Sequence, residues 1–199
     1  MSTCNIVLAG VGGQGILLAA EILGDAAVKA GYNVRVSELH GMAQRGGAVV
    51  SHVRIGERAL APTVLEGTAD LVLGFEPMEA LRNVQFASHK TTVLVNVEPF
   101  ALTGAKYPEV EEILEAIRGF TMDVISFNAA ALAKKTGTVM TQNLVMVGAL
   151  AATGKVPISV DNLKAALGTL IRTKYIDANI NAFELGYCTV NSLARSKRR

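Results

Sequence analysis

The chain has 199 residues, of which 50% are hydrophobic and 18% charged, with no Trp and a formal net charge of +2. A chain of this length buries a core large enough to fold without disulfides or metal ions. The small net charge excludes the strongly basic balance that is typical of nucleic-acid-binding domains. The basic residues at the end, Arg195, Lys197, Arg198 and Arg199, are a local feature, and we expect a solvated tail there.

The two cysteines, Cys4 and Cys188, are far apart, and no C-x-x-C pair exists. Neither a zinc ribbon nor an iron–sulfur cluster can therefore be built from this chain alone. Both cysteines lie among apolar residues, so we expect small buried hydrophobes. Residues 1–10 do not resemble a signal peptide, and no run of about 18 apolar residues occurs. These features predict a cytoplasmic protein without a membrane span.

The beginning of the chain predicts the start of a βαβ unit. Residues 5–9 form a short apolar run that is typical of a buried strand, and residues 14–30 carry apolar side chains at helical spacing. Gly31 lies where the cap at the end of that helix is expected. Residues 33–38 then predict a second strand.

The pattern next departs from a simple βαβ repeat. Residues 39–47 predict a glycine-rich loop, and residues 48–55 alternate like a half-buried strand. This alternation places Ser51 and His52 on opposite faces and, with no G-x-S-x-G motif present, argues against a hydrolase. Residues 58–61 would follow a turn. We therefore expect an antiparallel excursion within an otherwise parallel sheet.

Regular alternation of strands and helices resumes in the remainder of the chain. Strands are predicted over residues 70–75, 92–97 and 123–127, and helices over residues 77–86, 108–118, 128–135, 141–153, 159–171 and 178–195. Asn128, Thr141 and Ser159 are the candidate helix caps. No repeat or long linker divides the chain. Residues 1–199 are thus predicted to form a single three-layer α/β/α domain with a mostly parallel sheet and a Rossmann-like start.

The glycine turn after the first strand satisfies the pattern G-x-G-x-x-G over residues 10–15. It opens a helix, and Glu38 stands near the end of the second strand, as in dinucleotide folds. One interpretation is therefore an NAD- or FAD-binding Rossmann-type protein. The other is that the glycines only let the strand, the helix and a neighbouring chain pack closely, as in an interaction module.

A second glycine-rich segment, residues 40–47, follows the second strand at the same carboxyl edge of the predicted sheet. Within it Arg45 offers a planar fork of donors to a carboxylate or phosphate, or else forms an exposed salt bridge. Glu76 comes after a later strand and either points at this edge or stabilises the first turn of its helix. Two polar, glycine-rich loops at the carboxyl edge of the predicted sheet indicate a preformed binding surface there.

The chain resembles the gamma-type subunit of 2-oxoacid:ferredoxin oxidoreductases. Five segments carry the resemblance, namely residues 10–15, 37–47, 51–54, 69–71 and 75–77. The resemblance as a whole covers most of the chain, from about residue 5 to residue 190. The sequence His-Gly-Met-Ala-Gln-Arg-Gly-Gly of the second glycine segment is most similar to the beta-subunit group of indolepyruvate:ferredoxin oxidoreductases.

The resemblance implies a reaction in which a 2-oxoacid and coenzyme A become an acyl-CoA and carbon dioxide, with electrons passed to ferredoxin. The chain has no G-D-G…N thiamine motif and no cluster cysteines, so a larger subunit is expected to supply thiamine diphosphate, magnesium and [4Fe-4S] clusters. This chain would then bind no cofactor or metal by itself and be inactive alone.

By the same resemblance, this subunit completes the assembly and helps to shape the coenzyme A or substrate side of the site. The expected contact residues are Gly12, Gly13, Gln14, Arg45, Gly46 and Gly47. None of them is assigned a chemical step. An isolated subunit with an exposed apolar interface is also a candidate for homodimerisation.

Overall fold

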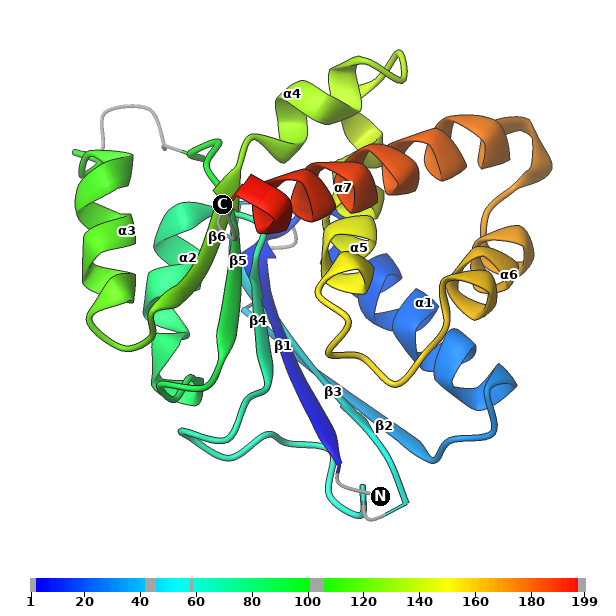
Figure 1. Cartoon of the computed structure of the whole chain (residues 1–199), viewed down its shortest axis with the longest axis horizontal. Coiled ribbons are helices and arrows are strands. Elements are labelled where there is room, and N and C mark those ends of the chain that lie inside the picture. The colour runs from blue at the N-terminus through cyan, green and yellow to red at the C-terminus, as the bar shows by residue number, and fades with distance from the viewer. Residues whose placement is uncertain (1–2, 42–45, 58, 101–105, 197–199) are drawn as a thin grey trace.

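The computed structural model describes residues 3–41, 46–57, 59–100 and 106–196 and contains a six-stranded sheet with the order β2-β3-β1-β4-β5-β6 (Figure 1). The strands are β1 (Cys4–Val11), β2 (Val34–His40), β3 (Ala48–Ile55), β4 (Leu71–Gly74), β5 (Thr92–Asn96) and β6 (Asp123–Phe127). Strands β1, β4, β5 and β6 are parallel, whereas β3 runs antiparallel to both β1 and β2. The predicted α/β fold with an antiparallel excursion is confirmed.

Helices cover both faces of the sheet (Figure 1). They are α1 (Ile16–Lys29), α2 (Pro77–Arg82), α3 (Val110–Arg118), α4 (Ala129–Lys134), α5 (Gln142–Ala152), α6 (Val160–Leu170) and α7 (Ile176–Ser196). Helices α2 and α3 pack on one face, and α1 and α5 on the other, with α6 and α7 outside them. Helix α2 is shorter than predicted, because the Asn83 amide donates to the Glu79 carbonyl and ends it.

The two apolar layers meet at the sheet, and β1 contributes to both of them. Ile6 and Leu8 belong to the core beneath α1 and α5, and Val7 belongs to the core beneath α2 and α3. All three side chains are 0% exposed. A parallel strand that is covered on both faces needs a continuous apolar sequence, which explains why residues 5–9 show no alternation.

The β2–β3 pairing differs from the prediction in two respects. Strand β2 continues to His40, which pairs with Val49, so the predicted loop over residues 39–47 is shorter. Strand β3 is buried on both faces, with Ser51 and His52 each 0% exposed, rather than half-buried. The reason is that α1 packs on one face of β3, whereas Val64 and Phe86 contact His52 on the other, which alternation along a single strand does not reveal.

Three of the predicted helix caps are confirmed. Gly31 has a φ of 82° after the end of α1, the Asn128 side chain accepts from the Ala131 N–H at the start of α4, and the Ser159 hydroxyl accepts a bond at the start of α6. Thr141 occupies the N-cap position of α5 as predicted, but its side chain does not cap the helix. Its hydroxyl donates to the Thr138 carbonyl in a preceding 3₁₀ turn and makes no cap bond.

Helix α7 corrects two further predictions. Its core-facing residues are Ala182, Phe183, Gly186 and Val190. Cys188 points away from that face and is exposed, whereas Cys4 is buried as predicted. Arg195 belongs to the last turn of the helix rather than to a tail. Among the described residues, no helix is long and apolar enough to cross a membrane.

Candidate functional site

The two glycine segments meet at the carboxyl edge of the sheet. The Gly12 N–H donates to the Gly47 carbonyl oxygen over 2.8 Å, and the Gly46 N–H donates to the Gly12 carbonyl oxygen over 3.4 Å. These bonds continue the antiparallel β1–β3 ladder, whose last pair joins Val11 to Ala48. The sequence-predicted residues Gly12, Gly46 and Gly47 are thus brought together, while Arg45 lies outside the described residues.

The Gln14 side chain fixes the shape of the glycine turn. Its Oε1 accepts from the Val11 N–H over 2.8 Å, and its Nε2 donates to the Phe75 carbonyl oxygen over 3.2 Å. A methyl group at Gly10 would lie 2.7 Å from the same Oε1 atom. Glycine at position 10 therefore leaves room for the Gln14 amide to link the turn to the end of β4.

Two asparagines that the sequence analysis did not single out support the same edge. The Asn96 Nδ2 also donates to the Phe75 carbonyl oxygen, over 3.0 Å, and its Oδ1 accepts from the Ala129 N–H at the start of α4. The Asn143 Nδ2 donates to the Gly15 carbonyl oxygen over 3.3 Å. Neither asparagine belongs to a recognisable motif, so only its position after folding reveals this role.

Gly15 brings α1 and α5 close together. It has a φ of 76°, where side chains are rarely tolerated, and an added methyl group would lie 2.6 Å from the Asn143 Nδ2. No side chain caps the start of α1, whose N-cap position Gly15 occupies. The turn therefore presents backbone rather than side chains at the beginning of the helix.

A cavity of about 530 Å³ adjoins the turn on the α1 side. Its lining consists of Val11, Gly12, Gly13, Gly15, Ile16, Leu17, Leu18, His40 and Val49. Aliphatic side chains and glycine backbone predominate, and no Lys or Arg among the described residues lines it. Such a lining suits an apolar group or a neighbouring protein surface better than a pyrophosphate, which favours cationic partners.

A smaller hollow of about 180 Å³ lies on the α2 side of the turn and includes Gly46 and Glu76 in its lining. Glu76 is 2% exposed. Its Oε2 accepts from the Glu79 N–H and caps α2, while its Oε1 accepts from the Phe100 N–H and the Tyr107 hydroxyl. Glu76 thus caps its helix at the carboxyl edge of the sheet, and both of its carboxylate oxygens accept hydrogen bonds from its own chain.

Two ionisable groups near Glu76, Tyr107 and Glu79, have shifted pKa values. Burial, and then the hydrogen bond to Glu76, raise the pKa of the Tyr107 hydroxyl, which remains a donor. Burial raises the pKa of Glu79, and the Arg82 guanidinium, 2.5 Å away, opposes that shift. The arrangement favours a rigid structural support for the edge over proton transfer.

The geometry argues against dinucleotide binding. Glu38 pairs with Ser51 of β3, which in turn pairs with Leu8 of β1, so one strand separates Glu38 from the glycine turn. At a strand spacing of about 4.8 Å this moves the acid roughly 10 Å from β1. The Gly12 N–H, which would face a pyrophosphate, is bonded to Gly47 instead.

Comparison with known proteins agrees with this geometry. Residues 5–189 match the family described as pyruvate ferredoxin/flavodoxin oxidoreductase. The gamma subunit of a keto/oxoacid ferredoxin oxidoreductase from Geobacter sulfurreducens superimposes with a TM-score of 0.72 at 24% identity, covering 95% of this chain and 99% of that one. Pyruvate oxidoreductase subunit PORC from Thermotoga maritima superimposes with a TM-score of 0.70 at 25% identity, covering 94% and 96%. The chain belongs to the pyruvate ferredoxin/flavodoxin oxidoreductase family.

Within that family, this chain is a subunit of a 2-oxoacid:ferredoxin oxidoreductase, and the matches contain no sign of an NAD- or FAD-binding protein. Indolepyruvate oxidoreductase subunit IorB from Pyrococcus horikoshii is 43% identical, over 94% of this chain and 95% of that protein. The IorB subunit from Archaeoglobus fulgidus is also 43% identical, covering 92% and 93%. The pyruvate/ketoisovalerate common subunit gamma from Pyrococcus abyssi is 29% identical, covering 75% and 77%.

Proposed function

We propose that the chain is a subunit of an oxidoreductase that acts on indolepyruvate or another aryl pyruvate. In that complex it would be the subunit that binds neither thiamine diphosphate nor iron–sulfur clusters. The higher identity to IorB subunits than to the pyruvate/ketoisovalerate subunit supports this choice of substrate. The complex would form an acyl-CoA and carbon dioxide and pass electrons to ferredoxin. A larger subunit would supply thiamine diphosphate, magnesium and [4Fe-4S] clusters. The unpaired cysteines fit a cytoplasmic location.

The observation that carries the proposal is the backbone pairing of Gly12 with Gly47. It unites both glycine segments into one surface without bulky side chains, which a partner chain and its bound cofactor can approach closely. We assign the contact with the coenzyme A or substrate side of the larger subunit to Gly12, Gly13, Gln14, Arg45, Gly46 and Gly47. The chain contributes binding surface and no catalytic residue.

Co-expression with the larger subunit tests the proposal. The assay is coenzyme A-dependent reduction of ferredoxin by indolepyruvate, with the chain alone and with the complex. We expect activity in the complex and none in the chain alone. We also expect Gly12→Ala and Arg45→Ala to weaken assembly or turnover, whereas Gly168→Ala, at a site where a methyl group meets open space, leaves both unchanged.

Two results would change the proposal. Decarboxylation of indolepyruvate by the chain alone with added thiamine diphosphate would remove the supporting role. If Gly12→Ala and Arg45→Ala weakened assembly but left the KM for coenzyme A of the assembled enzyme unchanged, the edge would be a docking surface only. Analytical ultracentrifugation of the isolated chain determines in parallel whether it forms a homodimer.

A further inference from the structure

A cleft of about 320 Å³ lies at the amino edge of the sheet, opposite the glycine turn. Its walls come from the beginnings of β5 and β6, the segment after α5 and the last turns of α7. The lining residues are Thr92, Asp123, Ile125, Ala152, Thr153, Lys155, Val190, Asn191, Ala194 and Arg195. Strands β4, β5 and β6 run parallel to β1. The starts of β5 and β6 therefore lie at the edge of the sheet away from the glycine turn, which follows the end of β1.

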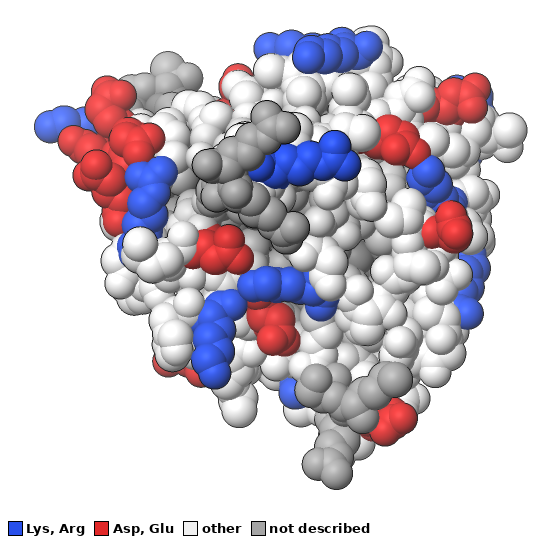
Figure 2. Space-filling view, in the orientation of Figure 1, with Lys and Arg blue, Asp and Glu red and all other residues white. Residues whose placement is uncertain are grey.

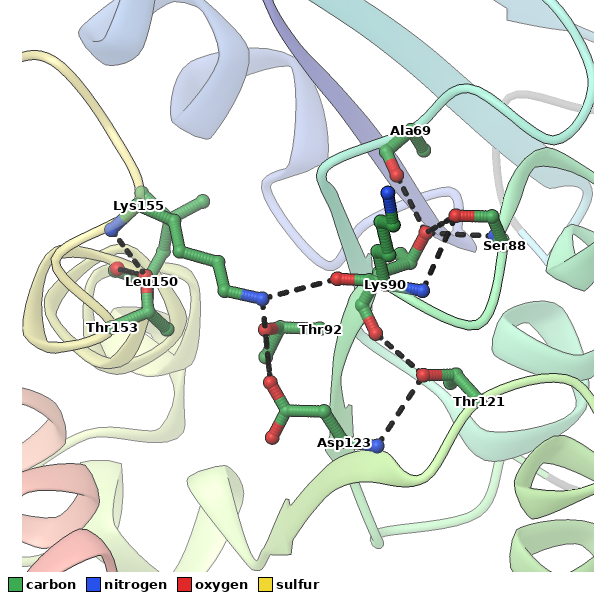
Figure 3. A network of polar contacts seen from close by, with 10 residues as sticks. Ala69, Ser88, Lys90, Thr92, Thr121, Asp123, Leu150, Thr153 and Lys155 are labelled. Carbon is green, nitrogen blue, oxygen red and sulfur yellow. Dashed lines mark hydrogen bonds and ion pairs between the residues drawn. The ribbon is translucent and has the colours of Figure 1, made fainter.

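The carboxylate in this cleft already has partners (Figure 3). The Lys155 ammonium lies 3.4 Å from the Asp123 Oδ2 and donates to the Lys90 carbonyl oxygen over 3.2 Å. The Thr92 hydroxyl donates to the same Oδ2 atom. The Asp123 N–H donates to the Thr121 hydroxyl, which ties β6 into the threonine network at this edge. Asp123 is thus committed to its own chain.

Arg195 is the cation of the cleft that Asp123 does not neutralise. Within the part of the chain that the structure describes, its guanidinium forms no ion pair or hydrogen bond. Lys197, Arg198 and Arg199 follow it in the sequence, and no acidic residue occurs after Glu184. Four positive charges in this last segment exceed the net charge of the whole chain, which is +2.

Figure 2 shows how charged side chains are distributed on the face of the molecule where α7 ends. Acidic side chains crowd over α3, where Glu109, Glu111, Glu112 and Glu115 occur within seven positions of the sequence. Around the end of α7, Lys and Arg side chains are visible in the same view, with Asp and Glu side chains among them. Arg195, which is unpaired within the described residues, and the basic residues after it in the sequence therefore form a local positive charge, which attracts an oppositely charged group.

We propose that the Arg195 cleft receives a carboxylate side chain from an acidic surface of the larger subunit. A guanidinium binds a carboxylate with two parallel hydrogen bonds, and the aliphatic walls of Ile125 and Val190 accommodate the methylenes of a Glu. The cleft has room for one or two side chains. This contact is separate from the glycine edge, and it rests on the proposed function because it assigns a second docking point on the same partner.

The test compares Arg195→Glu with Arg172→Glu, which makes the same charge change on the exposed connection before α7. The dissociation constant of this chain for the larger subunit is measured calorimetrically between 50 and 500 mM NaCl. We expect Arg195→Glu to weaken binding about tenfold at low salt and much less at high salt, where charges are screened. Arg195→Lys should recover part of the affinity, and Arg172→Glu should bind like the original chain.

Equal dissociation constants for Arg195→Glu and Arg172→Glu at low salt would overturn the inference while leaving the proposed function intact. No binding of the original chain to the larger subunit would overturn both. A nucleic-acid partner is the remaining alternative. Tighter binding of the chain to a single-stranded DNA oligonucleotide than to the larger subunit, lost in Arg195→Glu, would reject an acidic protein surface as the occupant.

Discussion

Gly148 of α5 and Gly186 of α7 each face the backbone of the other helix. A methyl group at Gly148 would overlap the Phe183 carbonyl oxygen, and one at Gly186 would overlap the Val145 carbonyl oxygen. Glycine at both positions therefore permits α7 to lie directly on α5. No side chain can substitute here without separating the two helices.

Replacing either glycine by alanine should destabilise the fold. Since the obstructing atoms are backbone, we expect Gly148→Ala and Gly186→Ala each to lower the free energy of unfolding by about 2–3 kcal/mol, measured by urea denaturation. Gly168→Ala in α6 is the matched control, because a methyl group there has no heavy atom within 4 Å. It should raise stability by about 0.5–1 kcal/mol through helix propensity. A similar loss in all three variants would contradict this account.

The Glu76–Tyr107 pair should show coupling in a double-mutant cycle. Tyr107→Phe removes the hydroxyl that donates to Glu76 and accepts from the Met78 N–H. Glu76→Gln places an amide where donors converge on a carboxylate. We expect Tyr107→Phe to lower the free energy of unfolding by about 1–2 kcal/mol and Glu76→Gln by about 2–3 kcal/mol. The double variant should lose less than the sum of the two. Strict additivity would mean that the two side chains do not depend on each other.

Acidification should destabilise the fold through His52. Burial lowers the pKa of this imidazole, whose Nδ1 accepts from the Val64 N–H over 3.0 Å. Below a pH of about 6.5 the unfolded chain binds the proton that the folded chain refuses, so stability falls as the pH falls. The slope contributed by this one group is at most about 1.4 kcal/mol per pH unit.

Denaturation between pH 7.5 and pH 5 measures this dependence for the original chain and for His52→Gln. The variant should lose the part of the slope that His52 contributes, whatever its absolute stability. His89→Gln, which changes an exposed histidine, should keep the slope of the original chain. Identical slopes in the original chain and His52→Gln would show that His52 is not the group responsible.

The two cysteines should differ in reactivity toward a thiol reagent. Cys4 is buried, and burial raises the pKa of its thiol to about 12, so it forms little of the reactive thiolate. Cys188 is exposed on α7. Iodoacetamide followed by peptide mass spectrometry should therefore modify Cys188 in the native chain and Cys4 only after unfolding. Rapid native labelling of Cys4 would indicate that the beginning of β1 opens readily.

The elements of this fold were largely predictable because their signals are local. Caps such as Asn128 and Ser159, and helical spacing over residues 14–30, depend on near neighbours in the chain. The burial of Ser51 and His52 was not predictable from alternation, because it depends on which distant segments cover the two faces of β3. Thr141 has the chemistry of a cap, but a competing 3₁₀ turn takes its hydroxyl.

The candidate site was predictable in its main feature and not in its supports. Two glycine segments after two strands indicate a common edge, and the Gly12–Gly47 bond agrees with that expectation. The roles of Asn96 and Asn143 depend on contacts between segments far apart in the sequence, which one sequence does not display. The glycine pattern alone also allowed a nucleotide, and the position of β3 between Glu38 and the turn argues against that alternative.

Two hydrogen bonds order the glycine turn: the Gly46 N–H donates to the Gly12 carbonyl oxygen, and the Gln14 Oε1 accepts from the Val11 N–H. These bonds have a thermodynamic consequence for assembly. A loop that its own chain has already ordered loses little conformational entropy when another surface covers it. The segment that leads into the antiparallel strand β3 thus holds the turn in place and preorganises it before any partner arrives.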